Sequence, residues 1–158
     1  MKVFIKTICL ASLLAVSLQA KADEDLVAAQ KFYEEYLQAG YTYDAAIVEM
    51  YTENALSHIK TFTADGKISD KIMTGDEIRK ALKLYVENGA KDKIKIVYEN
   101  AAYSLDASGV KVMAQVNYHH LCYKDNDYWA LLARDKSGSY KVKEEFLKIP
   151  EKSLCEAK

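Results

Sequence analysis

The stretch VKVMAQVNYHHLCYKDNDYW, Val110–Trp129, decides the fold, because apolar and polar side chains alternate along most of it. Alternation with a period of two is typical of a half-buried β-strand, since successive side chains of a strand point to opposite faces of a sheet. The polar run 124–127 predicts a turn into the next strand. We therefore expect a strand at residues 110–123 whose inner face carries every second side chain: Val110, Val112, Ala114, Val116, Tyr118, His120 and Cys122.

Further strands are expected on both sides of this stretch. Residues 93–104 alternate in the same way and lead into the turn Ala107-Ser108-Gly109, so they should form a hairpin with the strand that follows. Downstream, the turn 136–138 separates two more alternating runs. Besides the quoted one, the expected strands are residues 55–63, 67–73 (after a turn at 64–66), 93–104, 128–134 and 139–149.

Three helices are also expected. Apolar residues three and four apart predict a helix over 23–39 that Gly40 stops, and Asp44 is positioned to cap a shorter helix over 45–51. Thr74-Gly75-Asp76-Glu77 is a capping box, which predicts that a third helix starts there and ends at Asn88-Gly89. Helices first and a long antiparallel sheet afterwards indicate the α+β class.

Three motifs resemble the nuclear transport factor 2-like superfamily, and within it the SnoaL-like and ketosteroid isomerase-like branch. They are FYEEYLQAGYTYDAAIVEMYTENA (residues 32–55), MTGDEIRKAL (73–82) and YWALLARDKSGSYKVKEEF (128–146), and the resemblance covers nearly all of the chain after residue 22. It implies a cone-shaped domain, in which a strongly curved, mostly antiparallel sheet wraps around about three N-terminal helices and leaves a pocket at its open end.

The resemblance does not extend to the catalytic residues of steroid isomerases. Enzymes of that branch use a tyrosine on the first helix, which Tyr36 matches within one residue, and two acidic residues on later strands. The position of the general base falls on Ile59, beside His58, and the position of the late acid falls on Ala130. Neither Ile nor Ala can transfer a proton, so steroid isomerase chemistry is not expected, and His58 could act as a base only through a register shift of one residue.

The neighbouring pair His119 and His120 is not expected to bind a metal. In a strand their side chains point to opposite faces, so the phase of the apolar series puts His120 inside and His119 in solvent. No other spacing of histidines offers a ready-made pair of ligands. We predict no metal and no cofactor, and we keep His58 and His120 as weak candidates for proton transfer.

The chain contains twelve tyrosines, which is the most informative feature for function. Tyrosine combines apolar area with a hydroxyl that needs a partner, which suits a pocket for a small, partly polar molecule. The alternative is that the tyrosines only fill the sheet, where aromatic residues are favoured. The expected pocket residues are Tyr33, Tyr36, His58, Tyr118, His120 and Trp129.

Glu144 and Glu145 form an acidic pair near the end of the last expected strand. They should point to opposite faces unless a bulge intervenes. We interpret them as a solvated strand end, the alternative being that one of them faces the mouth of the cone opposite His120.

The first 22 residues have the features of a signal peptide: a basic start, about a dozen mostly apolar residues, and Ala20-Lys21-Ala22 as a cleavage site. We therefore expect a single domain over residues 23–158, in the periplasm or secreted, with no membrane span after processing. Its two remaining cysteines, Cys122 and Cys155, are expected to form a disulfide that places the chain end beside His120 and closes one side of the pocket.

These features favour a binding domain that holds a small amphipathic molecule in an aromatic pocket. A cofactor-free SnoaL-like isomerase, cyclase or lyase is one alternative, and a protein-interaction role, as a homodimer or in neutralising a toxin, is another. Nucleic acid is not an expected partner, because residues 23–158 carry 19 basic and 23 acidic side chains and no basic run.

Overall fold

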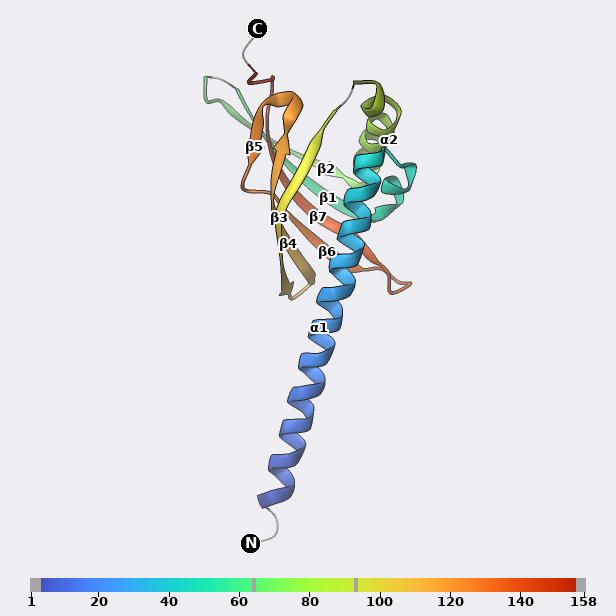
Figure 1. Cartoon of the computed structure of the whole chain (residues 1–158), viewed down its shortest axis with the longest axis vertical. Helices are drawn as coiled ribbons and strands as arrows, with labels where there is room; N and C mark the ends of the chain where they lie inside the picture. Colours follow the sequence, from blue (N-terminus) through green and yellow to red (C-terminus); the bar gives the residue numbers. More distant parts are fainter. Residues whose placement is uncertain (1–3, 64, 93, 156–158) are drawn as a thin grey trace.

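The computed structural model describes residues 4–63, 65–92 and 94–155, in which one long helix runs into a domain built on a single curved sheet (Figure 1). The helices are α1 (Phe4–Thr42) and α2 (Gly75–Asp92), with two short 3-10 helices, η1 (Ala45–Met50) and η2 (His119–Leu121). The strands are β1 (Tyr51–Phe62), β2 (Ile68–Thr74), β3 (Ile96–Asp106), β4 (Gly109–Tyr118), β5 (Tyr123–Asp125), β6 (Trp129–Arg134) and β7 (Tyr140–Pro150).

The seven strands are ordered β2-β1-β7-β6-β4-β3, and β5 adds to β4 outside this path. Every pair is antiparallel except β1 with β7, which is parallel. Register shifts interrupt β1 with β7, β3 with β4, and β6 with β7. Irregularities of this kind bend a strand and increase its twist, which fits the curvature of the sheet around the helices. The α+β cone expected from the sequence is confirmed.

The core lies between the inner face of the sheet and the second half of α1. The alternation of β4 is as predicted, since its even-numbered residues from Val110 to Tyr118 are all buried. They pack in one cluster with Ala29, Tyr33 and Tyr36 of α1. The quoted stretch therefore forms a half-buried strand up to Tyr118, with its apolar side toward the helix.

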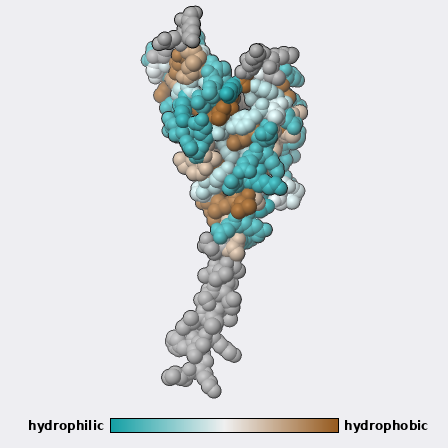
Figure 2. Space-filling model, viewed as in Figure 1, coloured by the Kyte–Doolittle hydropathy of each residue, from teal (hydrophilic) through white to brown (hydrophobic). Residues whose placement is uncertain are grey.

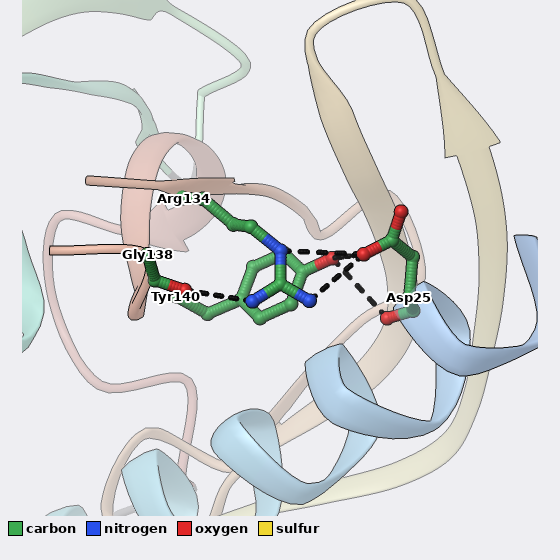
Figure 3. Close-up of polar contacts among 4 residues, drawn as sticks. All are labelled: Asp25, Arg134, Gly138 and Tyr140. Carbon is green, nitrogen blue, oxygen red and sulfur yellow. Dashed lines mark hydrogen bonds and ion pairs between the residues drawn. The ribbon is translucent and has the colours of Figure 1, made fainter. Parts of the chain in front are cut away.

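A polar cluster fastens α1 to the turn end of the β6–β7 hairpin (Figure 3). Asp25 accepts hydrogen bonds from Arg134 Nη2 at 2.8 Å and Nε at 3.2 Å, and the hydroxyl of Tyr140 donates to Asp25 as well. Arg134 also donates to the carbonyl of Gly138 at 2.7 Å. These contacts hold α1 on the sheet, while the helix before them extends away from the domain (Figure 1). The expected helix 23–39 thus lies inside a longer one.

The expectation that the strand continues to residue 123 is wrong. β4 ends at Tyr118, the chain turns through η2, and Cys122 takes a left-handed conformation with φ 51° before β5 begins. The N–H of His119 donates to Lys95, and the N–H of Cys122 donates back to His119. His119 and His120 are both exposed, so His120 does not lie on the inner face, because the strand ends before the period of two reaches it.

The disulfide between Cys122 and Cys155 is confirmed, with Cα atoms 5.1 Å apart. Beside it, the N–H of Leu154 donates to the carbonyl of Leu121, and the hydroxyl of Ser153 donates to the carbonyl of His120. The chain end is therefore pinned to η2 next to His120, as expected.

The helix boundaries follow the predicted signals in part. Asp44 caps η1 by accepting from the N–H of Ala46 at 2.8 Å. Glu77 accepts from the N–H of Thr74 at 2.8 Å and from its hydroxyl at 2.9 Å, so α2 starts where the capping box predicted. It does not stop at Gly89 but continues to Asp92. Gly89 is needed for close packing instead, because a Cβ there would lie 2.4 Å from the ring of Tyr43.

Within the described residues, no helix carries an apolar run of the length and hydropathy that crossing a membrane requires.

Candidate functional site

A cavity of about 180 Å³ lies between α1, η1, α2 and the inner face of the sheet. In the space-filling view the surface is hollowed between α2 and the strands opposite it, and hydrophobic side chains are visible in the hollow (Figure 2). Aliphatic side chains such as Leu37, Ile47 and Leu82 form part of the wall. The rest is mostly aromatic, from six tyrosines: Tyr36, Tyr41, Tyr51, Tyr85, Tyr98 and Tyr118.

Glu145 is the only charged residue among those described as lining this cavity. It is 5% exposed, and its Oε2 accepts a hydrogen bond from the hydroxyl of Tyr51 at 3.1 Å. That hydroxyl lies 2.8 Å from the hydroxyl of Tyr36, so a chain of hydrogen bonds links helix α1 to the carboxylate on β7. Ser57, which is buried on β1, is paired with Glu145 in the register of β1 and β7. The cavity thus has an apolar wall with one localised polar point.

Burial controls the ionisation of these groups. Burial raises the pKa of Glu145 above its ordinary value of 4.5, and the hydrogen bonds from Ser57 and Tyr51 only partly oppose this. Burial also raises the pKa of Tyr36, Tyr51 and Tyr98 well above 10. The buried tyrosines therefore present neutral hydroxyls, and Glu145 is the carboxyl group whose neutral form burial favours.

A bulge in β7 places Glu145 inside. In the pairing with β6, Glu144 lies opposite Leu131, while Val142 lies opposite Leu132, so Lys143 has no partner. The extra residue reverses the phase of the strand. Val142 faces inward before the bulge and Glu145 faces inward after it. An unbroken period of two from Val142 would have turned Glu144 inward instead, and the interpretation of the pair as a solvated strand end is wrong for Glu145.

The site residues expected from the sequence lie in four different places. Tyr36 and Tyr118 line the cavity. Tyr33 is fully buried in the core, with its ring stacked on Tyr36 at 5.8 Å, and does not line it. His120 is exposed on η2. Tyr51 and Glu145 also line the cavity although the sequence did not predict it, because their inward direction depends on a 3-10 helix and a bulge.

His58 and Trp129 lie on the opposite, outer face of the sheet. His58 Nε2 is 2.7 Å from Glu144 Oε1, and the rings of His58 and Trp129 are 6.5 Å apart. Trp129 stacks on Phe146 at 6.4 Å. We call these four residues the outer-face patch: His58, Trp129, Glu144 and Phe146. They are separated from the cavity by the sheet itself.

A carboxylate lies next to Ala130, the position where the sequence places the late acid of steroid isomerases. Ala130, where that position falls, is paired with Glu145 across β6 and β7, and Ser57 is paired with Glu145 across β1 and β7. The inner face therefore carries a carboxylate one strand away from the aligned position. Among the described residues, no three His, Cys, Asp or Glu side chains gather in a group that could hold a metal ion.

Comparisons with known proteins support the fold. No protein-family model matches the chain, and no curated protein sequence matches it. Among solved structures, a nuclear transport factor 2-like protein with a cystatin-like fold from Novosphingobium aromaticivorans is 11% identical over 91% of this chain and 90% of its own, with a TM-score of 0.51. A protein of the same family from Streptomyces avermitilis is 11% identical over 80% of this chain and 97% of its own, with a TM-score of 0.52.

A protein of unknown function from Mycobacterium tuberculosis is 14% identical over 81% of this chain and 73% of its own, with a TM-score of 0.51. Identities this low carry information about the fold alone. The chain has the nuclear transport factor 2-like fold, which is the fold that its sequence motifs resemble.

Proposed function

We propose that this protein binds a small amphipathic organic molecule in the tyrosine-lined cavity. The observation that carries the proposal is the hydrogen-bonded chain from Tyr36 through Tyr51 to Glu145, which ends at the wall of an otherwise apolar cavity. Ligand sites in proteins are commonly apolar clefts with a few convergent polar groups that fix orientation. A ligand with an apolar body and one polar group matches this arrangement.

The size of the cavity sets the size of the ligand. Its volume of about 180 Å³ is slightly larger than the ~150 Å³ engineered apolar cavity that takes up benzene in another protein. The ligand that fits without rearrangement is therefore a single ring or a short branched chain with one polar substituent.

Helix α2 offers a matched pair of variants to test this. Leu82 lines the cavity, whereas Leu84 is 59% exposed on the same helix. A thermal-shift screen with small ring compounds should find ligands that stabilise the wild type, because binding to the native state alone raises stability, by about 2.7 kcal/mol at 100 times Kd. Leu82→Trp should abolish the shift and Leu84→Trp should keep it. Equal shifts in both variants would place the ligand elsewhere.

Catalysis is the second candidate, and the observation that favours it is the buried carboxyl group. Burial raises the pKa of Glu145, and its carboxyl lines the cavity, so it is placed to exchange a proton with a bound ligand. It takes the place of His58 and His120 as the proposed proton-transfer group, since neither histidine lines the cavity. Exchange of a ligand C–H with deuterium from solvent, dependent on Glu145, would be the sign of such an activity.

We further propose that the protein is exported, with residues 1–22 removed as a signal peptide and residues 23–158 forming the mature domain in the periplasm or outside the cell. The Cys122–Cys155 disulfide supports this, because disulfides persist in oxidising compartments. Asp25, which fastens α1 to Arg134, would be retained. Intact-mass measurement of exported protein checks the proposal, and a mass that includes residues 1–22 would contradict it.

A homodimer through the outer-face patch remains a proposal. Next to the patch, Met113 is 53% exposed and Leu56 is 38% exposed, so joining two copies would bury apolar surface. Sedimentation should show a dimer for the wild type and a monomer for Trp129→Lys, because the substitution places a positive charge in the interface.

A further inference from the structure

We propose that the cavity selects a small organic cation, an ammonium group on a single ring or short branched chain, with Glu145 as its counter-ion and tyrosine rings as its walls. This inference rests on the proposed function, because it assumes that the cavity binds a small molecule, and it adds the chemical class of that molecule.

The first argument is charge balance. No Lys, Arg or His is among the residues described as lining the cavity, so nothing positive there offsets Glu145. Tyr51, which donates to its carboxylate, and Ser57, which is paired with it across β1 and β7, carry neutral hydroxyls. A buried carboxylate without a positive partner is strongly disfavoured. A ligand that brings a positive charge supplies the missing partner, whereas an anionic ligand would be repelled.

The second argument is the nature of the walls. Tyr36, Tyr51, Tyr98 and Tyr118 contribute aromatic rings around the same cavity that Glu145 lines. The faces of aromatic rings attract cations within about 6 Å, and this attraction is larger where water is excluded. Cages of aromatic rings with a nearby carboxylate are suited to ammonium groups, including fully methylated ones that cannot donate a hydrogen bond.

The third argument concerns protons. Burial raises the pKa of Glu145 in the empty cavity, and an ammonium ligand favours its ionised form. Binding should therefore strengthen as the pH rises through the pKa of Glu145 and should release a proton below it. The other titratable groups that line the cavity are six tyrosines: Tyr36 and Tyr41 on α1, Tyr51 on β1, Tyr85 on α2, Tyr98 on β3 and Tyr118 on β4. Burial raises the pKa of Tyr36, Tyr51, Tyr85, Tyr98 and Tyr118, so their hydroxyls stay neutral near neutral pH.

Two pairs of probes of matched shape separate charge from size: benzylamine with benzyl alcohol, and choline with 3,3-dimethylbutan-1-ol. We expect calorimetry at pH 8 to show each cation binding to the wild type at least tenfold more tightly than its neutral partner. Glu145→Gln should remove this preference, because it lowers the affinity for each cation to that of its neutral partner. Glu144→Gln, on the outer face, is the matched control and should keep the preference.

The outcomes distinguish the two proposals. If the alcohols bind in the cavity as tightly as the cations, or Glu145→Gln keeps the preference, the cation proposal is overturned and the binding function stands. If none of the four probes binds and the wider screen finds no ligand that Leu82→Trp blocks, the binding function itself fails. Should Glu145→Gln not fold, the ratio of benzylamine to benzyl alcohol affinity in the wild type decides: it should rise with pH, and a ratio below ten at pH 8 refutes the proposal.

Discussion

Two neighbouring glutamates on β7 show how strongly the two faces of this sheet differ. Glu145 is 5% exposed and receives hydrogen bonds from buried hydroxyls on the cavity side. The side chain of Glu144 is 33% exposed and lies 2.7 Å from His58 on the outer side. The residues are identical and adjacent, so their different properties come from the sheet that separates them. Only the inner carboxylate is held where water cannot screen it, which is why we assign the function to that face.

The aromatic residues differ between the faces in the same way. The inner face is lined by tyrosines, and the hydroxyls of Tyr36 and Tyr51 are used in the chain to Glu145. The outer face carries Trp129 and Phe146, with Lys111 5.0 Å above the first ring and Lys60 6.0 Å above the second. The inner aromatic residues therefore line an apolar cavity and hold its one carboxylate through their hydroxyls. The outer aromatic residues are instead partly covered by lysine side chains.

Truncating one aromatic residue on each face should give the largest contrast. Tyr33 is fully buried against α1 and the sheet, while Phe146 is half-buried on the outer face. Tyr33→Ala should lower the free energy of unfolding by about 3–5 kcal/mol, the range for deleting a buried aromatic side chain. Phe146→Ala should cost roughly 1 kcal/mol or less, as for most surface changes. Urea denaturation measures both, and equal losses would mean that the outer-face patch is as important for stability as the core.

Loss of the disulfide should be the next largest effect, and it should not reach the cavity. Replacing Cys122 and Cys155 by Ser should cost about 2–5 kcal/mol, the usual range for a small secreted domain. Because neither cysteine lines the cavity, ligand affinity at a temperature where the variant is folded should stay unchanged. The expectation that the bond closes one side of the pocket is wrong for the described part of the chain, since none of residues 148–155 is among those that line the cavity. A weaker ligand affinity in this variant would restore that role.

The sequence predicts most of the fold because local signals determine it. The alternation of Val110 to Tyr118 identifies β4, the Thr74 capping box identifies the start of α2, and the even pair of cysteines identifies the disulfide. The first two signals depend on residues close in sequence, and the third depends on the number of cysteines that remain after residue 22.

The site is harder to predict because its direction depends on irregular backbone. The turn at η2 ends the alternation of β4 before His120, so His120 does not face inward. The unpaired Lys143 shifts the alternation of β7 by one residue, so Glu145 does face inward. A period of two cannot reveal where an extra residue is inserted, and the parallel pairing that brings Ser57 beside Glu145 joins strands far apart in the sequence. In Lys-Val-Lys-Glu-Glu-Phe (residues 141–146) the alternation of polar and apolar residues is interrupted, which indicates a bulge but is equally compatible with a solvated strand end.

The pH dependence of stability should distinguish the two glutamates by a smaller amount. The pKa of Glu145 is raised in the folded protein, so its protonated form contributes stability that is present below the unfolded value of about 4.5 and is lost as the pH rises through the folded value. Each unit of difference corresponds to about 1.4 kcal/mol. Glu145→Gln should therefore become more stable relative to wild type as the pH rises.

Glu144→Gln is the control for that measurement and should lie within about 1 kcal/mol of the wild-type curve, the most that its exposed pair with His58 contributes. Asp125 also has a pKa raised by burial, so all three proteins share part of the slope, and the difference between curves isolates Glu145. Denaturation midpoints from pH 4 to pH 8 provide the test. Parallel curves for wild type and Glu145→Gln would mean that the inner carboxylate is as well solvated as the outer one.

The ion pair between His58 and Glu144 should show the smallest effect. Both side chains are about one-third exposed, so water and salt screen their attraction, and pairs of this kind contribute about 0–1 kcal/mol. A double-mutant cycle with His58→Ala and Glu144→Gln should give a coupling energy in that range, and the coupling should be smaller in high salt. A coupling above about 2 kcal/mol that salt does not reduce would require the pair to be shielded from solvent. The outer face would then be covered in solution, as in the proposed homodimer, and the contrast with Glu145 would no longer be one between a buried and a solvated carboxylate.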